Sequence, residues 1–457
     1  MASTYHATGG DEVLKQADVL CERRVLVFPA GTEIGMEIFA ALRGCRNIKL
    51  FGAGDDVSNH ARFAYREYYV VRNVHLDGWL EDLISICARL QIGYIFPAHD
   101  DAVVALSEAR EHIGAVIVTS PPDACLTTRS KSQTYRKLGK ILPVPRIYNS
   151  ASEVMSYPVF VKPDRGQGSR GAQRIDSNEQ LEVALKVDEE MIICDYLSGD
   201  EYTVDCLSSA QQGLLFAGAR QRRRTRNGIS VNTITENIPG IWEMASKISN
   251  ELTLRGAWFF QLKRDTAGTL TLLEVAPRVA GAMAAHRVSG VNFPLLSILE
   301  QDGILLKVTI NPGTVELDRS LRNRYLHDIQ FTTVYVDLDD TLICNDEVNL
   351  DVLRLLYSCI NRRKPVILLT RHQGDLTSTL QKYRLTSIFD EVIHIRDGTP
   401  KSAHIMRSGA IFIDDSFTER AEVARVCGIP TFDASMLEML IEQAEPLNTV
   451  VDWNKSI

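Results

Sequence analysis

Short apolar runs alternate with helical patterns along most of the 457-residue chain, and this alternation predicts an α/β protein. The first part of the chain is typical of a small open sheet with helices on both faces, ending near Pro121-Pro122. Its predicted elements are strands at 25–30, 50–54, 94–101 and 115–120, and helices at 36–43, 79–90 and near 102–112.

The middle of the chain is predicted to consist mainly of strand pairs that follow a helix at 130–139. The pairs, each joined by a tight turn, are 158–163 with 171–175, 191–197 with 201–207, and 257–264 with 270–276. The polar, weakly patterned stretch at 311–325 is the best linker candidate, and a fresh strand after it opens a third α/β unit. At roughly 100–200 residues per domain, we expect three domains, at 22–125, 126–312 and 330–457.

Composition excludes several classes of protein. Hydrophobic residues make up 45% of the chain and charged residues 24%, values that are typical of a soluble globular protein. The formal net charge is −8 without a long basic run, which argues against a nucleic-acid or anionic-membrane partner. Nine cysteines occur without a C-x-x-C pair, so neither a zinc site nor a disulfide framework is indicated.

The N-terminal segment has no apolar core of the kind that a secretory signal carries, and no stretch is long enough to span a bilayer. We therefore expect a cytoplasmic protein.

A glycine-rich hairpin, YPVFVKPDRGQGSRGAQRI at 157–175, carries the first chemical signal. Its first strand brings Lys162 to a loop that contains Gly166, Gly168 and Gly171. Glycines let backbone N–H groups close over phosphate oxygens, and a lysine neutralises their charge. The loop joins two strands and not a strand to a helix, so it predicts a flexible flap and not a P-loop. Alone, it is equally consistent with a plain surface hairpin.

Three further blocks give this hairpin a context. Lys131 begins the helix predicted at 130–139, the segment MIICDYLSGDEYTVD at 191–205 carries Glu201, and WFFQLKRDTAGTLTLLEVAPRVAG at 258–281 places Gln261 and Glu274 on adjacent strands. In this order the blocks resemble the ATP-grasp superfamily, most closely its carbamoyl-phosphate-synthase-like branch. The resemblance covers about residues 22–310 and implies a pre-ATP-grasp sheet at 22–125 followed by an ATP-grasp (α+β) fold at 126–312.

The resemblance also implies cofactors and roles, carried over by position. ATP and Mg²⁺ are the expected cofactors, with Mn²⁺ as a substitute ion. For the nucleotide phosphates the implied residues are Lys131 and Lys162, with the 164–171 loop and its Gly166, Gly168 and Ser169 as the lid. The adenine edge would be read at Cys194, Asp195 and Tyr196, and the ribose would be bound by Glu201. The implied metal ligands are Gln261 and Glu274, and Arg278 is the implied catalytic residue that faces the transferred phosphoryl group.

One position departs from the family. The family's usual Glu-x-Asn-Pro-Arg is here Glu274-Val275-Ala276-Pro277-Arg278, so Ala276 offers no oxygen to a second metal ion. Mg²⁺ readily keeps water among its six ligands, so the change does not exclude catalysis. An alternative for Glu274 is a half-buried carboxylate paired with Arg278.

The expected reaction transfers the γ-phosphoryl group of ATP to a carboxylate, and an amine then attacks the acyl phosphate. The basic segment RQRRRTRN at 220–227 is expected to be a loop on the substrate side. It is either a solvated run of charge or a clamp for an anionic substrate, phosphorylated compounds included, which guanidinium groups suit. For His286 a structural role is favoured, while Arg287 is a further candidate. The substrate candidates are Arg220, Arg222, Arg224, Arg278 and Gly281.

The segment YVDLDDTL at 335–342 signals a different chemistry. Asp337-Leu338-Asp339-Asp340-Thr341 resembles the first motif of the haloacid-dehalogenase-like (HAD) phosphatases. The later motifs follow in order at Thr370, Lys401 and Asp414-Asp415, and the resemblance covers about 330–435. It implies a Rossmann-like domain, in which gaps of about 30 residues between motifs leave no room for a separate cap domain.

In this family's chemistry, Asp337 would attack phosphorus and become an aspartyl phosphate, while Asp339 would protonate the leaving group and then activate water. Thr370 and Lys401 would hold the phosphoryl oxygens. A divalent ion offsets the repulsion between carboxylate and phosphate, and its candidate ligands are Asp337, Asp339, Asp414 and Asp415.

The two resemblances together predict a bifunctional enzyme, a carboxylate–amine ligase joined to a phosphatase that acts on its substrate or product. Alternatives left open are carbamoyl-phosphate-type chemistry on bicarbonate and ammonia, a nucleotide sensor that regulates the phosphatase, and a purely structural C-terminal domain. ATP-grasp relatives are often homodimers, but nothing in the sequence identifies an interface.

Overall fold

The computed structural model describes residues 22–441 except for 167, 169, 187–189 and 326. The chain divides into two compact units, the first ending at Arg322 and the second beginning at Asn323. The boundary lies inside the stretch expected to be a linker, although that stretch also contains the strand β15 (Glu316–Asp318), which pairs with the first unit.

The N-terminal part of the first unit is a five-stranded parallel sheet of order β3-β2-β1-β4-β5. Its strands are β1 (Arg23–Phe28), β2 (Ile48–Gly54), β3 (Tyr68–Val70), β4 (Tyr94–Pro97) and β5 (Val116–Ile117), and its helices are α2 (Glu33–Leu42), α3 (Trp79–Leu90) and α4 (Asp100–Glu108).

Strand β1 is buried on both faces of this sheet, as strands covered by helices on either side must be. Val25 and Val27 pack on the side of α2, while Leu26 and Phe28 pack on the side of α3 and α4. The chain reverses its direction of travel across the sheet between β1 and β4. Carboxyl-end loops at such a switch point form a natural binding crevice.

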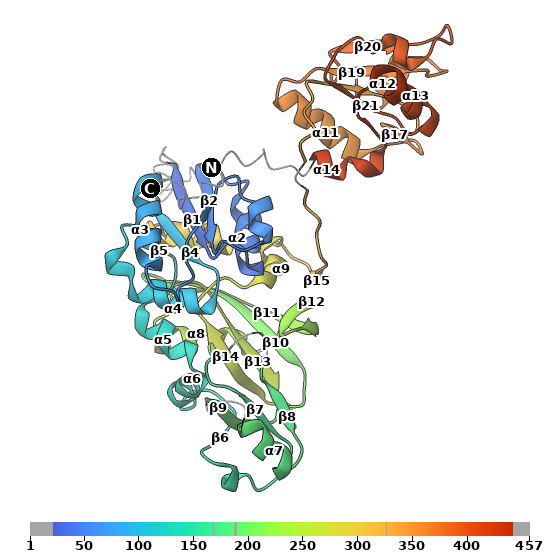
Figure 1. Ribbon diagram of the computed structural model, residues 1–457. Coiled ribbons are helices and arrows are strands. Elements are labelled where there is room, and N and C mark those ends of the chain that lie inside the picture. The colour runs from blue at the N-terminus through green and yellow to red at the C-terminus, as the bar shows by residue number, and fades with distance from the viewer. Residues whose placement is uncertain (1–21, 167, 169, 187–189, 326, 442–457) are drawn as a thin grey trace, which may run out of the picture. The chain divides into compact units, whose positions relative to one another are not determined.

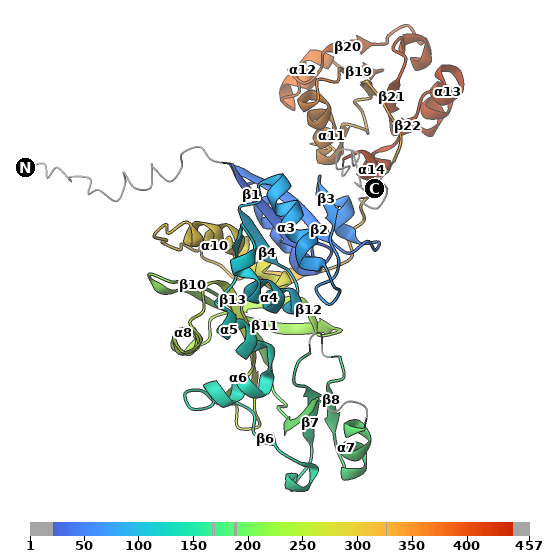
Figure 2. The same cartoon turned by 60° about the vertical axis from the view of Figure 1, so that its left-hand side comes forward.

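Two antiparallel sheets follow, and Figures 1 and 2 show them below the N-terminal sheet within the first unit. The smaller has the order β6-β9-β7-β8 and the larger β14-β13-β10-β11-β12-β15. Their strands are β6 (Ile147–Tyr148), β7 (Val159–Pro163), β8 (Gln173–Ile175), β9 (Met191–Asp195), β10 (Glu201–Ser209), β11 (Gly213–Arg226), β12 (Ile229–Glu236), β13 (Gly256–Arg264) and β14 (Leu270–Ala276).

Helices cover these sheets, and one apolar core joins the larger sheet to the N-terminal sheet. Phe259 of β13 packs in the same cluster as Val27 of β1 and Phe293 of α10, whereas Trp258 packs on the other face with Ile248 of α8. The helices of this part are α5 (Pro122–Arg129), α6 (Lys131–Leu138), α7 (Asn178–Leu185), α8 (Ile241–Leu252), α9 (Ala284–Arg287) and α10 (Phe293–Gln301).

Two expectations for this region are wrong. The strands predicted at 191–197 and 201–207 do not pair with each other, because β9 pairs with β6 and β7 while β10 pairs with β11 and β13. The basic segment at 220–227 is not a loop, because β11 continues to Arg226 and pairs with β12. In the first case the local pattern indicated extended chain, and in the second it indicated a polar segment. In neither case did it reveal which strand is the partner.

The second unit is a five-stranded parallel sheet of order β20-β19-β16-β21-β22 with helices on both faces. Its elements are the strands β16 (Thr333–Val336), β17 (Ile343–Cys344), β18 (Glu347–Val348), β19 (Val366–Thr370), β20 (Glu391–His394), β21 (Ala410–Ile413) and β22 (Thr431–Phe432), and the helices α11 (Leu350–Asn361), α12 (Leu376–Lys382), α13 (Phe417–Cys427) and α14 (Glu438–Ile441).

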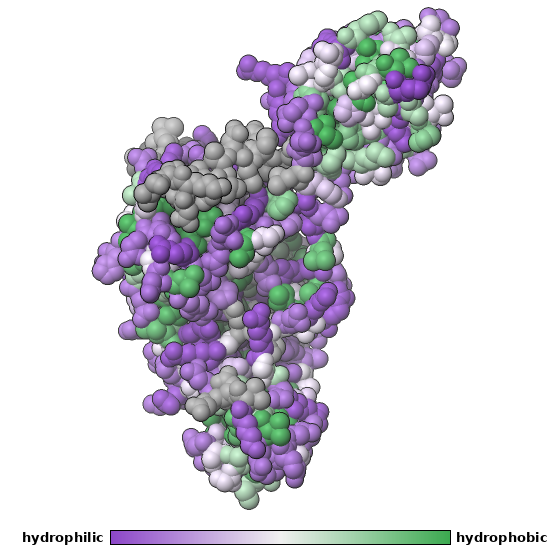
Figure 3. All heavy atoms as spheres, in the orientation of Figure 1, coloured by the Kyte–Doolittle hydropathy of each residue, from purple (hydrophilic) through white to green (hydrophobic). Residues whose placement is uncertain are grey.

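Smaller differences concern element ends. Helix α2 begins at Glu33, three residues before the predicted start, because Thr32 caps it by accepting from the Gly35 N–H. The strand predicted at 94–101 ends at Pro97, because His99 caps α4. On the surface seen in Figure 3, hydrophilic residues predominate in the first unit, while hydrophilic and apolar residues are mixed on the second.

Candidate sites in the two units

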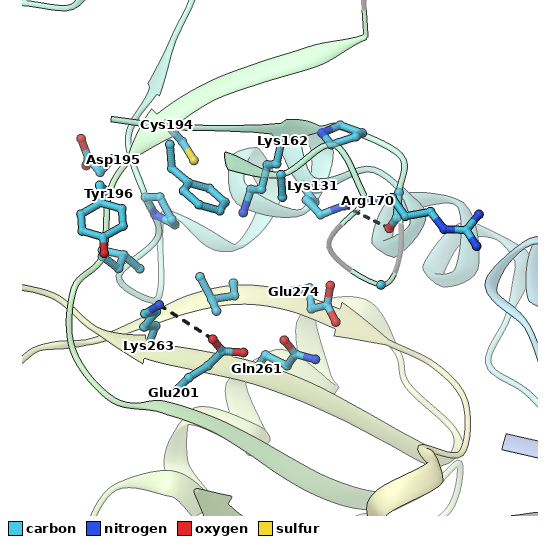
Figure 4. Close-up of a pocket in the computed structure, with 18 residues that line it drawn as sticks. Lys131, Lys162, Arg170, Cys194, Asp195, Tyr196, Glu201, Gln261, Lys263 and Glu274 are labelled. Atoms are coloured by element: carbon cyan, nitrogen blue, oxygen red, sulfur yellow. Dashed lines mark hydrogen bonds and ion pairs between the residues drawn. The ribbon is translucent and has the colours of Figure 1, made fainter. Parts of the chain in front are cut away.

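A cleft lies between the two antiparallel sheets of the first unit (Figure 4). We call it the inter-sheet cleft. Its open volume, with the solvent-filled mouth included, is about 830 Å³. The predicted ATP-site residues that line it are Lys131, Lys162, Gly166, Gly168, Cys194, Asp195, Tyr196, Glu201, Gln261 and Glu274. Ser169 lies outside the described residues.

The floor of the cleft presents oxygen ligands from neighbouring strands. Gln261 of β13 lies directly opposite Glu274 of β14, so their side chains leave the sheet as close neighbours. Glu201 comes from the next strand, β10, and reaches up beside Gln261 in Figure 4. Amide and carboxylate oxygens are ligands that Mg²⁺ accepts, so Gln261 and Glu274 fit a metal ion. Ala276 is buried and contributes none.

Two lysines face this floor from the other side of the cleft. Lys162 of β7 is buried and donates to the Tyr135 hydroxyl at 2.7 Å, which in turn donates to the Leu273 carbonyl at 2.6 Å. Lys131, the first residue of α6, donates to the carbonyls of Asp164 and Gly166, both at 3.3 Å. Burial lowers the pKa of Lys131, and the nearby Glu274 opposes this effect. Both ammonium groups are therefore directed at one volume.

The glycine-rich loop closes one end of the cleft. Gly168 and Gly171 have φ of +62° and +71°, conformations that a side chain would strain. A Cβ on Gly168 would lie 3.2 Å from the Asn227 carbonyl, so the loop tip packs against the turn between β11 and β12. Arg170, which the sequence analysis missed, lines the cleft at this end.

The opposite end is formed by the connection between β9 and β10. The Asp195 carboxylate accepts from the Arg146 N–H and the Tyr148 hydroxyl, both at 3.0 Å, and this fixes the backbone around Cys194 and Tyr196. Glu201 is not isolated, because Arg222 lies 2.9 Å and Lys263 3.9 Å from its oxygens. A ribose predicted at Glu201 would share the carboxylate with these cations.

A second cavity adjoins the cleft, and we call it the arginine cavity. The residues Gly168, Arg170, Gln261 and Glu274 line both spaces. Its other walls come from the carboxyl edge of the N-terminal sheet, through Thr32, Glu33, His99 and Asp100, and from Thr203, Arg220, Arg222, Arg278, Gly281 and Arg319. The metal-ligand pair therefore lies where the two spaces meet.

Three arginines of this cavity, Arg220, Arg222 and Arg278, are held by carboxylates. Arg220 donates to both oxygens of Asp205 at 2.9 and 3.1 Å, and both side chains are almost fully buried. Burial alone would raise the pKa of Asp205, but Arg220 and His286 outweigh it and lower this pKa. Arg278 donates to Asp100 at 2.5 Å. The alternative that Arg278 pairs with Glu274 is therefore wrong.

Three atoms of residues in the cavity wall are buried without a hydrogen-bond partner among the described residues, Thr203 Oγ1, Arg220 Nη1 and Arg222 Nε, of which Arg222 Nε forms an ion pair with Glu201 at 2.9 Å. Thr203 and Arg220 are opposed on β10 and β11. Buried donors in native proteins normally have partners, so this wall is suited to accept an oxyanion. Neither Thr203 nor Arg319 was predicted from the sequence, because Thr203 was given no role within the segment at 191–205 and Arg319 belongs to no local motif.

Other substrate candidates lie elsewhere. Arg224 pairs with Asp318 at 2.7 Å, is 60% exposed and lines neither space, so its substrate assignment is corrected. Arg287 likewise lines neither space, because it pairs with Glu37. His286 is buried, with Nδ1 2.9 Å from Asp205, consistent with the structural role favoured for it. Gly281 lines the arginine cavity against the Arg319 guanidinium.

In the second unit the predicted motif residues gather at the carboxyl ends of three adjacent parallel strands. Asp337 follows β16, Thr370 ends β19, and Asp414 and Asp415 follow β21. Asp337, Asp414 and Asp415 each present an oxygen within 4.8 Å of the others. This carboxylate cluster has the hard oxygen donors that Mg²⁺ prefers, so it fits the implied ion.

Lys401 lies beside this cluster, with Nζ 2.9 Å from Asp337 and 2.5 Å from Asp414. Burial raises the pKa of Asp337 to about 6, with Lys401 opposing the rise and Asp414 adding to it. Burial likewise raises the pKa of Asp414. A cation in the cluster would relieve the repulsion between the two carboxylates.

Asp339 differs from its predicted metal-ligand role. Among the described residues, Asp339 is not a member of the carboxylate cluster, and its side chain is half exposed. Its carboxylate accepts from His372 Nδ1 at 2.9 and 3.1 Å. His372 was not predicted from the sequence, although it stands only two residues after Thr370. The pairing brings together residues 33 positions apart.

Comparison with known proteins agrees with the geometry of the first unit. Residues 187–326 match the family described as ATP-grasp in the biosynthetic pathway with Ter operon, which is less than half of the chain. Over 74 residues the chain is 32% identical to D-alanine–D-alanine ligase of Fusobacterium nucleatum, covering 16% of this chain. That match spans only 26% of the curated relative.

Among solved structures, the biotin carboxylase of Campylobacter jejuni superposes with a TM-score of 0.55 at 16% identity, over 64% of this chain and 74% of its own. The biotin carboxylase domain dimer of Hydrogenobacter thermophilus 2-oxoglutarate carboxylase, determined with MgADP, ADP and bicarbonate, gives 0.56 at 16% identity over 65% and 74%. The L-amino acid ligase of Bacillus licheniformis gives 0.50 at 16% over 61% and 74%.

Within the described part of the chain, no helix is both long and apolar enough to cross a membrane. At the identities above, the structural likeness concerns the fold. Residues 187–326 are therefore similar to an ATP-grasp family, and the first unit shares its fold with the two biotin carboxylases above.

Proposed function

We propose that the first unit is an ATP-dependent ligase that joins a carboxylate to an amine. The observation that carries the proposal is the convergence of Lys131, Lys162, Gln261 and Glu274 on the inter-sheet cleft. These side chains come from four separate elements, yet they place two cations opposite a metal-compatible pair of oxygens. That arrangement suits the triphosphate of a magnesium nucleotide. We assign 22–125 to the pre-ATP-grasp domain and 126–312 to the ATP-grasp domain.

The reaction would begin at the junction of the two spaces. A carboxylate oxygen of the substrate attacks the γ-phosphorus of ATP, the bond to the bridging oxygen of ADP breaks, and an acyl phosphate forms. Lys131, Lys162 and Arg278 would stabilise the charge that spreads over the phosphoryl oxygens. Magnesium held by Gln261 and Glu274 would supply further charge neutralisation when bound.

The second half of the reaction would take place in the arginine cavity. An amine attacks the acyl carbon, phosphate leaves, and the nitrogen gives up a proton, so that an amide and inorganic phosphate result. The unsatisfied atoms of Thr203 and Arg220 support an anionic substrate in this cavity, because a guanidinium and a hydroxyl together suit a carboxylate or phosphate.

For the second unit, with its domain assigned to 330–457, we propose a magnesium-dependent phosphatase of the HAD type. The carboxylate cluster of Asp337, Asp414 and Asp415 at the ends of parallel strands supports this proposal. Asp337 would attack phosphorus, and the leaving oxygen would take a proton from Asp339. Water would then release phosphate from the aspartyl group, with Thr370 and Lys401 holding the phosphoryl oxygens. Its substrate would be the phosphorylated substrate or product of the ligase.

A coupled assay tests both proposals with the full chain. Pairs of carboxylates and amines, including phosphorylated amino acids and sugars, are screened for ADP release, with Glu274→Gln as the inactive control. For the pair that gives ADP, phosphate release from the ligation product should be lost in Asp337→Asn while ADP formation continues. Equal loss of both activities in Asp337→Asn would contradict separate sites.

The same screen distinguishes the remaining alternatives. ATP binding without ADP formation for every pair would favour a nucleotide sensor. ATP turnover that requires only bicarbonate and ammonia would favour carbamoyl-phosphate-type chemistry. Full ADP release after truncation near residue 325, with no hydrolysis of phosphate esters by the whole chain, would leave the second unit with a structural role.

A further inference from the structure

We propose that His372 is a positioning residue that holds Asp339 for proton transfer in the second unit. This inference rests on the phosphatase proposed above and concerns a residue outside the motifs that suggested it. His372 follows Thr370 by two residues, and its ring lies between the Asp339 carboxylate and the first turns of α12.

The ring contacts Asp339 and Thr379 through its two nitrogens. Nδ1 lies 2.9 Å from Asp339 Oδ1 and 3.1 Å from Oδ2, and Nε2 lies 3.0 Å from Thr379 Oγ1. An ionised carboxylate can only accept, and a protonated Asp339 whose O–H faces the leaving group still accepts through its other oxygen, so in both states Nδ1 carries the proton and donates to Asp339. In the neutral ring Nε2 then accepts from the Thr379 hydroxyl. Thr379, His372 and Asp339 therefore form one directed chain of hydrogen bonds.

Asp339 needs such support because, within the described residues, its backbone alone is otherwise fixed. The main chain of Asp339 bridges to Ile343, but its side chain is 51% exposed, whereas the His372 side chain is only 15% exposed. An exposed carboxyl group rotates freely, and ordering it has an entropic cost. A donor shared between both oxygens restricts this rotation before substrate arrives, and such preorganisation raises the rate of proton transfer.

The backbone of His372 is anchored independently of its ring. Its N–H donates to Thr370 Oγ1 at 3.2 Å, and its carbonyl accepts from His394 Nε2 at 2.7 Å. The preceding Arg371 donates to Glu419 at 3.1 Å and to the Thr399 carbonyl at 2.7 Å. Substitutions of the ring should therefore leave the loop in place.

The test compares two esters of nearly equal shape, phenyl phosphate and p-nitrophenyl phosphate, with the full chain and Mg²⁺. Phenoxide needs a proton to leave, whereas p-nitrophenoxide leaves readily without one. We measure kcat/KM, which reports steps up to formation of the aspartyl phosphate. Asp339→Asn defines the loss expected without the acid, and Asp337→Asn gives the background.

For His372→Ala we expect kcat/KM for phenyl phosphate to fall about 10- to 100-fold, part of the contribution of a general acid, and that for p-nitrophenyl phosphate to fall less than about threefold. His372→Asn should recover most of the loss, because its amide N–H can replace Nδ1–H. His372→Gln, whose amide reaches toward the Nε2 position, should resemble His372→Ala. Thr379→Val, which removes the hydroxyl beside Nε2, should lower kcat/KM for phenyl phosphate by less than His372→Ala does. Thr379→Ser, which keeps the hydroxyl, should not lower it.

Equal losses for the two esters in His372→Ala, or no recovery in His372→Asn, would overturn the inference and indicate a substrate contact or a purely structural ring. A wild-type chain that hydrolyses neither ester, or an Asp337→Asn variant that retains activity, would overturn the phosphatase proposal itself. The two failures are therefore distinguishable.

Discussion

The substitution Arg220→Leu should destabilise the first unit strongly, because it leaves the charge of Asp205 buried. Asp205 accepts two hydrogen bonds from Arg220 and contacts His286, and its side chain is fully buried. The substitution removes two of these three contacts. Breaking a buried ion pair from one side costs about 3–5 kcal/mol, and the remaining His286 contact places the expected loss near the lower limit, about 3 kcal/mol.

Tryptophan fluorescence can measure this loss in the full chain. Trp79, Trp242 and Trp258 all lie in the first unit, and the fourth tryptophan, Trp453, lies outside the described residues. Trp258 is fully buried and donates to Ser208 at 2.9 Å. Urea unfolding followed by fluorescence therefore reports the free energy of unfolding of the first unit. Arg224→Leu, at an exposed pair on the same strand, is the matched control and should lose less than about 1 kcal/mol.

The pH dependence gives a second check on the cause. The lowered pKa of Asp205 in the wild-type chain contributes stability that is present above the pKa of the unfolded chain, about 3.9. This stability is lost as the pH falls through the folded-state pKa. In Arg220→Leu the burial of Asp205 is no longer offset by Arg220, so the folded-state pKa rises. Protonation then relieves the buried charge, and the deficit relative to wild type should shrink as the pH falls from neutrality.

Adding Asp205→Asn to Arg220→Leu should recover part of the stability at neutral pH, because no unpaired charge remains. A deficit below about 1 kcal/mol that does not change with pH would refute the reasoning, since it would mean that the buried charge of Asp205 does not depend on Arg220.

Four further predictions concern the two sites. Glu274→Gln should reduce ADP release about 100-fold by removing the charge that would hold magnesium, with unfolding in urea unchanged; normal ADP release at saturating Mg²⁺ would contradict the metal assignment. Ala276→Asn should lower the Mg²⁺ concentration that gives half-maximal ADP release, because it adds an oxygen ligand, and a higher requirement would count against it. Lys162→Met should raise the KM for ATP about 10- to 100-fold, the equivalent of a charged hydrogen bond, and an unchanged KM would remove Lys162 from the phosphate site. Asp414→Asn should abolish hydrolysis of p-nitrophenyl phosphate while ADP release persists, and retained hydrolysis would exclude Asp414 as a metal ligand.

The order of elements and several local arrangements could be predicted from the sequence. Two apolar runs joined by a tight turn located β13 and β14, and their short connection placed Gln261 opposite Glu274. Apolar runs followed by Asp337, Thr370 and Asp414 indicated parallel strands, and carboxyl ends of such strands meet at one sheet edge. In these cases the interaction is local or follows from a general rule of sheet geometry.

The sequence did not determine which strands pair when the pairing is distant. Residues on either side of the β9–β10 turn enter two different sheets, although the same pattern is usual in a hairpin. The basic segment of β11 looked like a loop because it carries charge on both faces, yet its backbone pairs with β12. Periodicity reports that a segment is extended and which side is apolar, but contains no information on its partner.

The sequence by itself therefore determined the chemical groups of this protein, namely the lysines, the opposed oxygen ligands and the carboxylates at strand ends. Only the tertiary structure decided that Arg220 is held by Asp205, that Arg224 pairs with Asp318 outside both cavities, and that His372 donates to Asp339. The reason is that charge pairing and burial depend on contacts between residues far apart in the chain, which form only when the sheets and helices pack.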